Sequence, residues 1–552
     1  MSPRRLILCT VLLGVAAAPV TAWTPLGTYL LGAAQASSHR LPPGNITVPT
    51  ARTLAWQPAS ALSQEVLQLW AAKPLADWAT KGKDDVPRVL LARFLTRDRL
   101  PETNAFLRTL LPRGVVGSKW ALNPGGDYDF SLTVLTTILW LHGNDPAVLY
   151  PAAREHLLKV LLTQEGGNFV TTAPRTLGLV RETENHILMT EGSRYLKNRW
   201  LHTHGSTSPR HDNLANGLEG KLLGVLTEPA VNGLYEFNSQ PYIAYTITAL
   251  LNLEAFGSEA VRAAARTALD TLNFAYALGS YRLRHYPPFR RNYGYAASPS
   301  LTFGYQTVFM HTWLSYLPAK FEPPVVPGHT GNHAIIAVAL PYRPPDRVVQ
   351  LLRDKGPGYF VRLGHGPRSS PELYTAGPGF LLSAGGVHRG ERSLIAARPI
   401  TLILDDSAAT LPEVFNLGGP GGDFRHWNNT GVYENFACAA GPVHVPARFS
   451  ARASGGGWQI FPAAPGRWIA VYSTPSLGLL AVFAHDSAED LLASLLRANP
   501  AAAELVRGFV FPDGRRLTFD PYAPADSWVM QSFDGKTLDR DFDRWPLISG
   551  RF

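Results

Sequence analysis

The stretch RETENHILMTEGSRYLKNRW, residues 181–200, is the one around which the rest of the chain is organised. Residues three and four apart are neighbours on a helix, so a helix here places Glu182, Asn185 and His186 on one face. That face is too polar for ordinary core, whereas the remaining positions carry enough apolar side chains to pack. The stretch therefore predicts a helix that presents an Asn-His pair to a cleft.

A second helix is predicted in the stretch EFNSQPYIAYTITALLNLEAF, residues 236–256. Asn238, Tyr242 and Tyr245 open this stretch at the same three- to four-residue spacing. We expect the polar faces of the two segments to meet in one cleft.

Helical periodicity extends on both sides of these two stretches, from about residue 51 to residue 320. Apolar residues recur at three- and four-residue spacing over residues 63–79, 86–98, 101–111, 130–143, 145–164, 213–226, 259–279 and 299–317. Roughly ten helices without a fixed repeat period favour a closed (α/α) toroid over a repeat solenoid.

The pattern changes after Pro323 and Pro324 to short apolar or alternating runs bounded by glycine and proline, which is typical of strands. These runs cover residues 334–342, 358–366, 379–386, 393–404, 458–464, 468–474, 478–486 and 508–519. Residues 345–355 and 488–499 read as helices. We expect residues 328–552 to form an antiparallel β-sandwich domain after a toroid domain over residues 45–322.

The first 22 residues show a basic start, an apolar run and small residues before a possible cut after Ala22, as secretory signal peptides do. We therefore expect export to the periplasm or the extracellular space, with no membrane span left after cleavage. Cys9 leaves with the signal, so Cys438 has no cysteine partner for an internal disulfide. Its apolar setting favours a packed side chain over a nucleophile.

The chain carries 51 Lys and Arg against 42 Asp and Glu, a formal net charge of +9. A basic excess suits a partner with negative charge. No nucleic-acid-binding motif is present, which excludes that class of partner for an exported chain. We expect an acidic polysaccharide or oligosaccharide.

A helical region followed by strands, with Asn-His on one helix and Tyr on a later one, resembles the toroid-type polysaccharide lyases of the alginate lyase and heparinase-like families. Glu184-Asn185-His186 is similar to their Asn-Asn-His motif, with Glu184 in place of the first Asn. Tyr242 or Tyr245 matches their catalytic Tyr. The resemblance implies a lyase that cleaves uronate-containing chains by β-elimination.

This chemistry explains the residue types. Asn185 would stabilise the substrate carboxylate as negative charge develops. His186 and a Tyr would share the roles of base and acid, and a Tyr with an ordinary pKa of about 10 needs nearby positive charge to ionise. Four basic residues of the stretch 282–295 would supply that charge and bind the acidic substrate: Arg284, His285, Arg290 and Arg291.

Other polar and aromatic residues complete the predicted substrate-binding set. These are Asp127, Tyr128, Glu182, His202, His204, Glu236, Asn238 and Trp427. No cofactor is expected. His202, His204 and His211 form the one candidate zinc site, since His-x-His places two imidazoles on one side of an extended segment. Calcium is the other metal considered.

Two other classes of function stay open. Asp127, Asp129, Glu182, Glu184 and Glu236 offer paired carboxylates for a glycoside hydrolase, which helical toroids also host. A non-catalytic glycan-binding protein of the envelope would need none of these groups.

Overall fold

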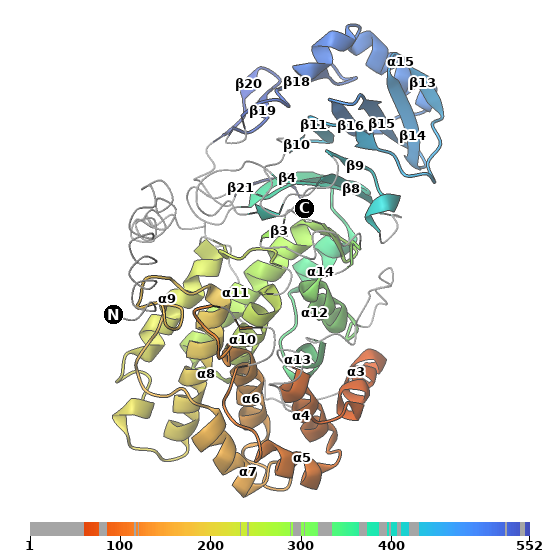
Figure 1. Ribbon diagram of the computed structural model, residues 1–552. Helices are drawn as coiled ribbons and strands as arrows, with labels where there is room; N and C mark the ends of the chain where they lie inside the picture. The colour runs from red at the N-terminus through yellow and green to blue at the C-terminus, as the bar shows by residue number, and fades with distance from the viewer. Residues whose placement is uncertain are drawn as a thin grey trace, which may run out of the picture.

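The computed structural model describes the chain in segments, and every structural statement below concerns them (Figure 1). They are residues 60–76, 85–114, 118–119, 121–231, 233–239, 242–286, 289–290, 300–302, 304–317, 334–363, 372–385, 395–396, 399–405, 410–418, 430–524, 527–540 and 547–551. The predicted signal peptide, Arg291 and Trp427 lie outside these segments.

Helices make up the first part of the chain, drawn from red to green in Figure 1. They are α3 (Ala61–Ala72), α4 (Asp85–Thr96), α5 (Leu100–Leu107), α6 (Asp129–His142), α7 (Pro151–His156), α8 (Glu184–Thr203), α9 (Leu218–Val231), α10 (Ile243–Phe256), α11 (Glu259–Leu278), α12 (Tyr305–Leu314), α13 (Ala334–Ala339) and α14 (Asp346–Arg353). A π-helical turn, Leu157–Leu161, continues α7. Helix α15 (Ala488–Ala498) occurs later in the chain, in the part that consists mostly of strands.

Helices α6, α8 and α10 form the centre of the helical part. All residues of α10 are buried, as expected for a helix that is apolar all round. Asp129 at the start of α6 contacts His186 in the first turn of α8, and Phe130 contacts Tyr245 in the first turn of α10. The three helices therefore begin at the same end of the helical part.

The remaining helices pack around this centre. Along one side α4 contacts α3 and α6, while along the other α10 contacts α12. Helix α12 contacts α13, which in turn contacts α3 and α4, so the packing returns to the first helices. Helix α11 contacts α9, α10 and α14. Its sequence is amphipathic, so one side of the helix is buried and the other side is at least partly exposed.

Antiparallel sheets make up the second part, drawn from cyan to blue in Figure 1. A seven-stranded sheet has the order β12-β9-β8-β6-β5-β4-β21 and a six-stranded sheet the order β10-β11-β16-β15-β14-β13. A four-stranded sheet, β17-β18-β19-β20, and two strand pairs, β1-β2 and β3-β7, complete the described sheets.

The strands have the following bounds: β1 (Ser280–Tyr281), β2 (Arg284–His285), β3 (Phe289–Arg290), β4 (Gly358–Leu363), β5 (Glu372–Gly377), β6 (Phe380–Gly385), β7 (Ile395–Ala396), β8 (Ile400–Leu404), β9 (Asn416–Leu417), β10 (Thr430–Tyr433), β11 (Phe436–Ala439), β12 (Val443–His444), β13 (Ala453–Gly455), β14 (Trp458–Ala464), β15 (Arg467–Ser473), β16 (Gly478–Ala484), β17 (Gly508–Val510), β18 (Arg516–Phe519), β19 (Met530–Phe533), β20 (Lys536–Thr537) and β21 (Leu547–Arg551).

The seven-stranded sheet is buried on both faces. Successive side chains of a strand point to opposite faces. Thus Tyr374 and Ala376 of β5 join the core of the helical part, whereas Leu373 joins the core shared with the six-stranded sheet. This sheet is the layer through which the two parts of the chain are packed together.

The structure confirms most of the predicted elements and corrects two. The helix expected over residues 236–256 begins only at Ile243, and Asn238 lies before it with a positive φ of 46°. Residues 334–342 were expected to form a strand, but Ala334–Ala339 is helix α13. A short, fully buried apolar run has no periodicity that separates strand from helix. With α13 and α14 packed on other helices, the helical part continues to Arg353, beyond the expected boundary between residues 322 and 328.

The described chain is thus of mixed α/β class, with helices first and antiparallel sheets after them. None of its described helices combines the length and the hydrophobicity that crossing a membrane requires.

Candidate functional site

The candidate site lies where α6, α8 and α10 begin. The first turn of a helix carries unpaired backbone N–H groups and a partial positive charge. The first turns of α6, α8 and α10 lie close together here, and each carries side chains that the sequence analysis named as candidates.

His186 and Asp129 form the central pair of this site. His186 Nδ1 and Asp129 Oδ2 are hydrogen-bonded, and Asp129 Oδ1 accepts the N–H of Phe130 at 3.0 Å. The His186 side chain is 18% exposed. Among the described residues no group bonds its other ring nitrogen, Nε2. The pair therefore offers one nitrogen to a ligand while a carboxylate orients the ring.

The charge of His186 follows from its neighbours. Burial by itself lowers the pKa of His186, but the negative charges of Asp129, Glu182 and Asp127 outweigh it. Together they raise this pKa from 6.5 to about 9. His186 is therefore an imidazolium at neutral pH, held next to three carboxylates.

Asn185 precedes His186 in the first turn of α8 and is buried, with 1% of its surface exposed. Its Oδ1 accepts a hydrogen bond from the hydroxyl of Thr183, the residue that precedes α8. Its Nδ2 has no hydrogen-bond partner among the described residues. Buried polar groups are nearly always satisfied, so this buried, unpaired amide is an unusual feature of the first turn of α8.

Tyr245 is brought to the same place by Phe130. The Phe130 ring lies edge-on to both His186 and Tyr245, with ring centroids 5.4 Å and 4.6 Å away. Tyr245 is 7% exposed. Tyr242, just before α10, is partly buried and packs against the same core. Two of the predicted residues, His186 and Tyr245, thus contact the same aromatic ring.

Acidic side chains surround this group. Burial raises the pKa of Glu182, whose Oε1 accepts the N–H of Thr183 at 3.0 Å. Asp127 accepts a hydrogen bond from the Asn123 amide. The Glu184 Oε1 accepts the N–H of Glu236 at 3.2 Å and so ties α8 to the segment that leads into α10.

Asn238 lies at the border with the seven-stranded sheet. Its Nδ2 donates to Oε2 of Glu372, which also accepts the hydroxyl of Tyr374. Its Oδ1 lies 3.5 Å from Nε2 of His285. Burial raises the pKa of Glu372 to about 7, although the two hydrogen bonds act in the opposite direction.

Arg284 and His285 do not supply the positive charge expected of them. Arg284 is buried and donates to the backbone carbonyls of Tyr281 and Asp405. Burial lowers the pKa of His285 to about 3, so its ring is neutral at neutral pH. Arg290 is described only as part of β3, without its side chain. The positive charge at this site comes instead from His186.

Other predicted residues lie elsewhere. His202 and His204 are exposed at the far end of α8, and His202 is sixteen residues from His186, or about 24 Å along a helix. The His204 ring stacks on Trp200, while His211 bonds Ser206. No group of three or more potential metal ligands occurs in the described part of the chain, so the proposed zinc site is not assembled there.

Tyr128 has a structural role. Its hydroxyl donates to the carbonyl of Leu161 at 2.9 Å, and burial raises its pKa. The hydrogen bond ties the start of α6 to the π-helical turn. Tyr128 therefore positions Asp129 rather than offering its hydroxyl to a ligand.

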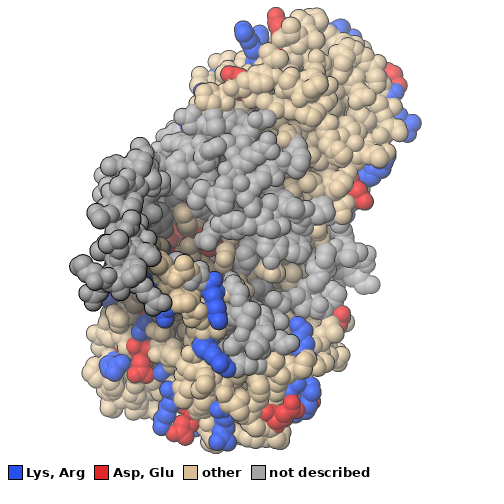
Figure 2. All heavy atoms as spheres, viewed as in Figure 1, with Lys and Arg blue, Asp and Glu red and all other residues tan. Residues whose placement is uncertain are grey.

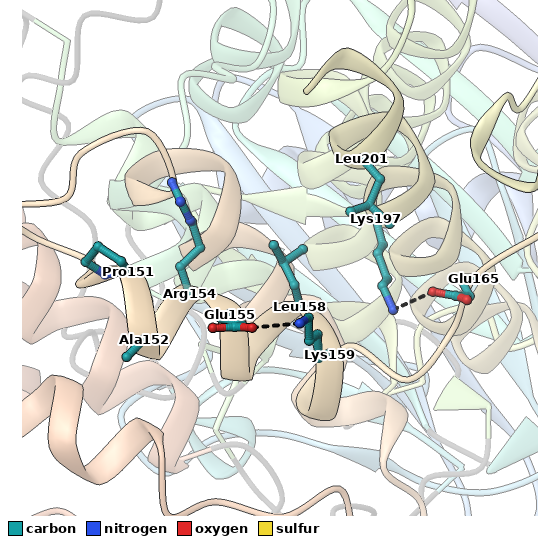
Figure 3. Close-up of a pocket in the computed structure, with 9 residues that line it drawn as sticks. All are labelled: Pro151, Ala152, Arg154, Glu155, Leu158, Lys159, Glu165, Lys197 and Leu201. Atoms are coloured by element: carbon teal, nitrogen blue, oxygen red, sulfur yellow. Dashed lines mark hydrogen bonds and ion pairs between the residues drawn. The ribbon is translucent and has the colours of Figure 1, made fainter. Parts of the chain in front are cut away.

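An open groove of about 780 Å³ lies between α7, the π-helical turn and α8 (Figure 3). Four of its five charged side chains form ion pairs, Lys159 with Glu155 and Lys197 with Glu165, and the fifth, Arg154, donates to the carbonyl of Gly143. Lys197 is eleven residues beyond His186 on α8. This groove is therefore separate from the candidate site.

Figure 2 shows basic and acidic side chains interspersed over the visible face of the helical part, without a continuous basic surface on that face. The net positive charge thus indicates no particular docking surface there.

Two important residues escaped the sequence analysis. Asp129 was interpreted as a hydrolase carboxylate, not as the partner of His186. Glu372 was not considered at all. Its one sequence signal is the spacing Glu372-x-Tyr374, which puts both polar side chains on the same face of a strand otherwise built from apolar and small residues.

No protein-family model matches this chain, and no curated protein matches its sequence. The argument for a function therefore rests on the geometry of the site.

Proposed function

We propose that this protein is an exported polysaccharide lyase-like enzyme that cleaves an acidic, uronate-containing glycan by β-elimination. The observation that carries the proposal is the partly exposed His186 ring, which Asp129 orients and whose Nε2 has no partner among the described residues. An imidazolium with a ring N–H to donate is suited to binding a carboxylate. Asn185, the neighbouring residue on α8, has an amide without a partner among the described residues.

The proposed reaction begins with neutralisation of the uronate carboxylate by Asn185 and His186, which makes the neighbouring C–H more acidic. Tyr245 or Tyr242, as phenolate, takes that proton. The electron pair forms a C=C bond, the glycosidic C–O bond breaks, and the leaving oxygen takes a proton from the tyrosine hydroxyl, which becomes a phenolate again. A nearby imidazolium favours the phenolate form of a tyrosine.

The fold we propose for this function is an (α/α) toroid followed by an antiparallel β-sandwich. The return of helix contacts from α13 to α3 and α4 supports the toroid. The core shared by the seven- and six-stranded sheets supports the sandwich. Cleavage of the predicted signal peptide would deliver the enzyme to the periplasm or the outside of the cell, where such glycans occur.

The test is to incubate the purified mature protein with uronate-containing and neutral polysaccharides and to follow ultraviolet absorbance and reducing ends. A lyase raises both, because its product is unsaturated. His186→Ala should lower turnover by at least about a hundredfold, the scale of one lost acid–base group. His204 directly follows the far end of α8. The control variant His204→Ala should therefore retain wild-type turnover. Wild-type activity in His186→Ala would overturn the proposal.

A glycoside hydrolase is the second candidate, favoured by one observation. Glu182, with its raised pKa, lies close enough to Asp127 and Asp129 for their charges to contribute to that shift. A carboxyl group with a raised pKa beside a second carboxyl group is the arrangement that glycoside hydrolysis uses. New reducing ends without absorbance, lost in Glu182→Gln, would select this candidate. Binding without cleavage would select a glycan-binding protein instead.

A further inference from the structure

Glu372 is a buried carboxylate that the proposed reaction does not use. It is 4% exposed and is the first residue of β5, an interior strand of the seven-stranded sheet. Its Oε2 accepts hydrogen bonds from the hydroxyl of Tyr374 on its own strand and from the amide of Asn238 in the helical part. The second of these bonds joins two parts of the chain that are 134 residues apart in sequence.

Asn238 is the residue through which this bond acts on the candidate site. Its φ is +46°, a left-handed conformation that asparagine adopts more readily than most residues. The conformation turns the chain between Glu236 and the start of α10. A side-chain hydrogen bond to a fixed carboxylate stabilises such a turn.

The described segment 233–239, which we call the α10 lead, is held at both ends of its turn. Upstream of Asn238, the N–H of Glu236 donates to Glu184 in the first turn of α8. Downstream, the carbonyl of Ser239 accepts the N–H groups of Tyr242 and Ile243 at 3.1 Å and 3.0 Å. The position of the α10 lead therefore determines where α10 begins.

The sheet is well placed to hold Glu372 still. The strand β5 pairs with β4 on one side and β6 on the other, and all of its residues are buried. Tyr374 packs against Gly279 at the end of α11, where a Cβ would come within 2.5 Å of the tyrosine ring. The carboxylate thus projects from a rigid surface rather than from a loop.

We propose that Glu372 is a positioning residue of the candidate site: through Asn238 the sheet fixes the α10 lead, and with it the tyrosines that begin α10. Where it concerns catalysis, this inference rests on the proposed lyase function. It gives the second part of the chain a defined role in a site whose other side chains come from the helical part.

The test measures hydrogen exchange of peptides that cover residues 233–243, by mass spectrometry on the full chain. Glu372→Ala and Asn238→Ala should each speed exchange there by about tenfold, the effect of one lost buried hydrogen bond on local opening. Glu372→Gln keeps an acceptor oxygen and should stay close to the wild-type rate. The double variant should exchange no faster than the faster single one, because both remove the same bond.

The matched control is Ser383→Ala. Ser383, on the neighbouring strand β6, also donates a buried hydrogen bond across the same border, to the carbonyl of Tyr286 at 2.9 Å. Its loss should leave exchange at residues 233–243 unchanged. Equal acceleration in Ser383→Ala and Glu372→Ala would overturn the proposal, since it would indicate general loosening of the border. Unchanged exchange in a folded Glu372→Ala protein would overturn it as well.

A kinetic measurement extends the test to the reaction. On a glycan that the wild type cleaves, Glu372→Ala should lower kcat by about tenfold with KM unchanged, and Glu372→Gln should restore most of it. A KM change alone would contradict a positioning role for the tyrosines. If the wild type cleaves no glycan, the lyase function fails, while the exchange experiment still decides the role of Glu372 in the fold.

Discussion

His186 shows how neighbouring charges determine the state of one side chain. Isolated in an apolar setting, a histidine is neutral at neutral pH because burial disfavours the charged form. Here three carboxylates reverse that preference and raise the pKa to about 9. The proposed reaction uses the charged form, so activity should fall as pH rises through about 9. A pH–rate profile of kcat checks this, and a rate that rises through that range would assign His186 the role of base.

The same shift makes a prediction about stability. A pKa raised from 6.5 to about 9 stabilises the folded state by about 3 kcal/mol below pH 6.5. This contribution is lost as pH rises from 6.5 through 9. Urea denaturation across that range should show the loss in the wild type and not in Asp129→Asn, where burial dominates again. Asp513→Asn, at an exposed pair with Arg515, should keep the wild-type slope.

Glu372 titrates in a different window. Its pKa is raised from 4.5 to about 7, so the folded state holds a proton that the unfolded chain releases. Stability should therefore fall as pH rises from 4.5 to 7, and Glu372→Gln should remove that fall. Glu372 affects stability between pH 4.5 and about 7, and His186 between pH 6.5 and about 9. Because these pH ranges overlap only slightly, one denaturation series separates the two contributions. A wild-type slope that persists in Glu372→Gln would contradict the assignment.

At the scale of elements, two helix ends are joined by one buried lysine. Lys355 is fully buried, and its Nζ donates to the carbonyls of Ala277, Ser280 and Leu351. These carbonyls lie at or just after the C-terminal ends of α11 and α14, where backbone acceptors lack helical partners. Burial lowers the pKa of Lys355, but the three acceptors and the helix ends favour its charged form.

Lys355→Met should therefore destabilise the protein by about 3 kcal/mol, because it keeps the side-chain length and leaves three buried carbonyls without a donor. Urea denaturation at pH 7 measures the change. Lys159→Met, at an exposed pair with Glu155, is the control and should have little effect. Wild-type stability in Lys355→Met would mean that these carbonyls find other donors.

Helix α8 has two ends with different roles. Its first turn carries Asn185 and His186, whereas the middle and last turns bury Arg194, Lys197 and Asn198 against the segment from Leu162 to Gly166. A polar helix of this kind is buried through specific hydrogen bonds rather than through an apolar stripe. This explains why its sequence carries so many polar residues without making all of them functional.

At the scale of the molecule, the sheets complete the core of the helical part. Tyr359, Val361, Tyr374 and Leu381 belong to that core although they lie in the seven-stranded sheet. A chain that ends after Arg353 would expose the apolar surface that these residues cover. We expect such a fragment to bind a hydrophobic dye and to lose the near-ultraviolet circular dichroism of the intact protein. Cooperative unfolding of the fragment would show that the helices are stable alone.

Most elements could be predicted because their signals are local. Apolar residues recur every three or four positions in α11 and alternate in strands such as β14, and neighbouring residues alone determine these patterns. The start of α10 was placed too early, because Asn238, Tyr242 and Tyr245 have a helical spacing although the helix begins only at Ile243. The strand predicted in place of α13 was also wrong, because α13 is six residues long and apolar throughout and so carries no period. The extent of the helical part was misplaced for the same reason.

The sequence by itself determined most of the order of helices and strands. It also determined that Asn185 and His186 lie in the same helix turn, because adjacent residues stay adjacent in any fold. Only the tertiary structure decided that Asp129, 57 residues from His186, would hold its ring, and that Glu372 would hold Asn238. It also decided that Arg284 and His285 would be buried rather than supply charge. The physical reason is that periodicity reports which face of an element is buried, whereas charge and hydrogen bonding depend on which distant side chains share that burial.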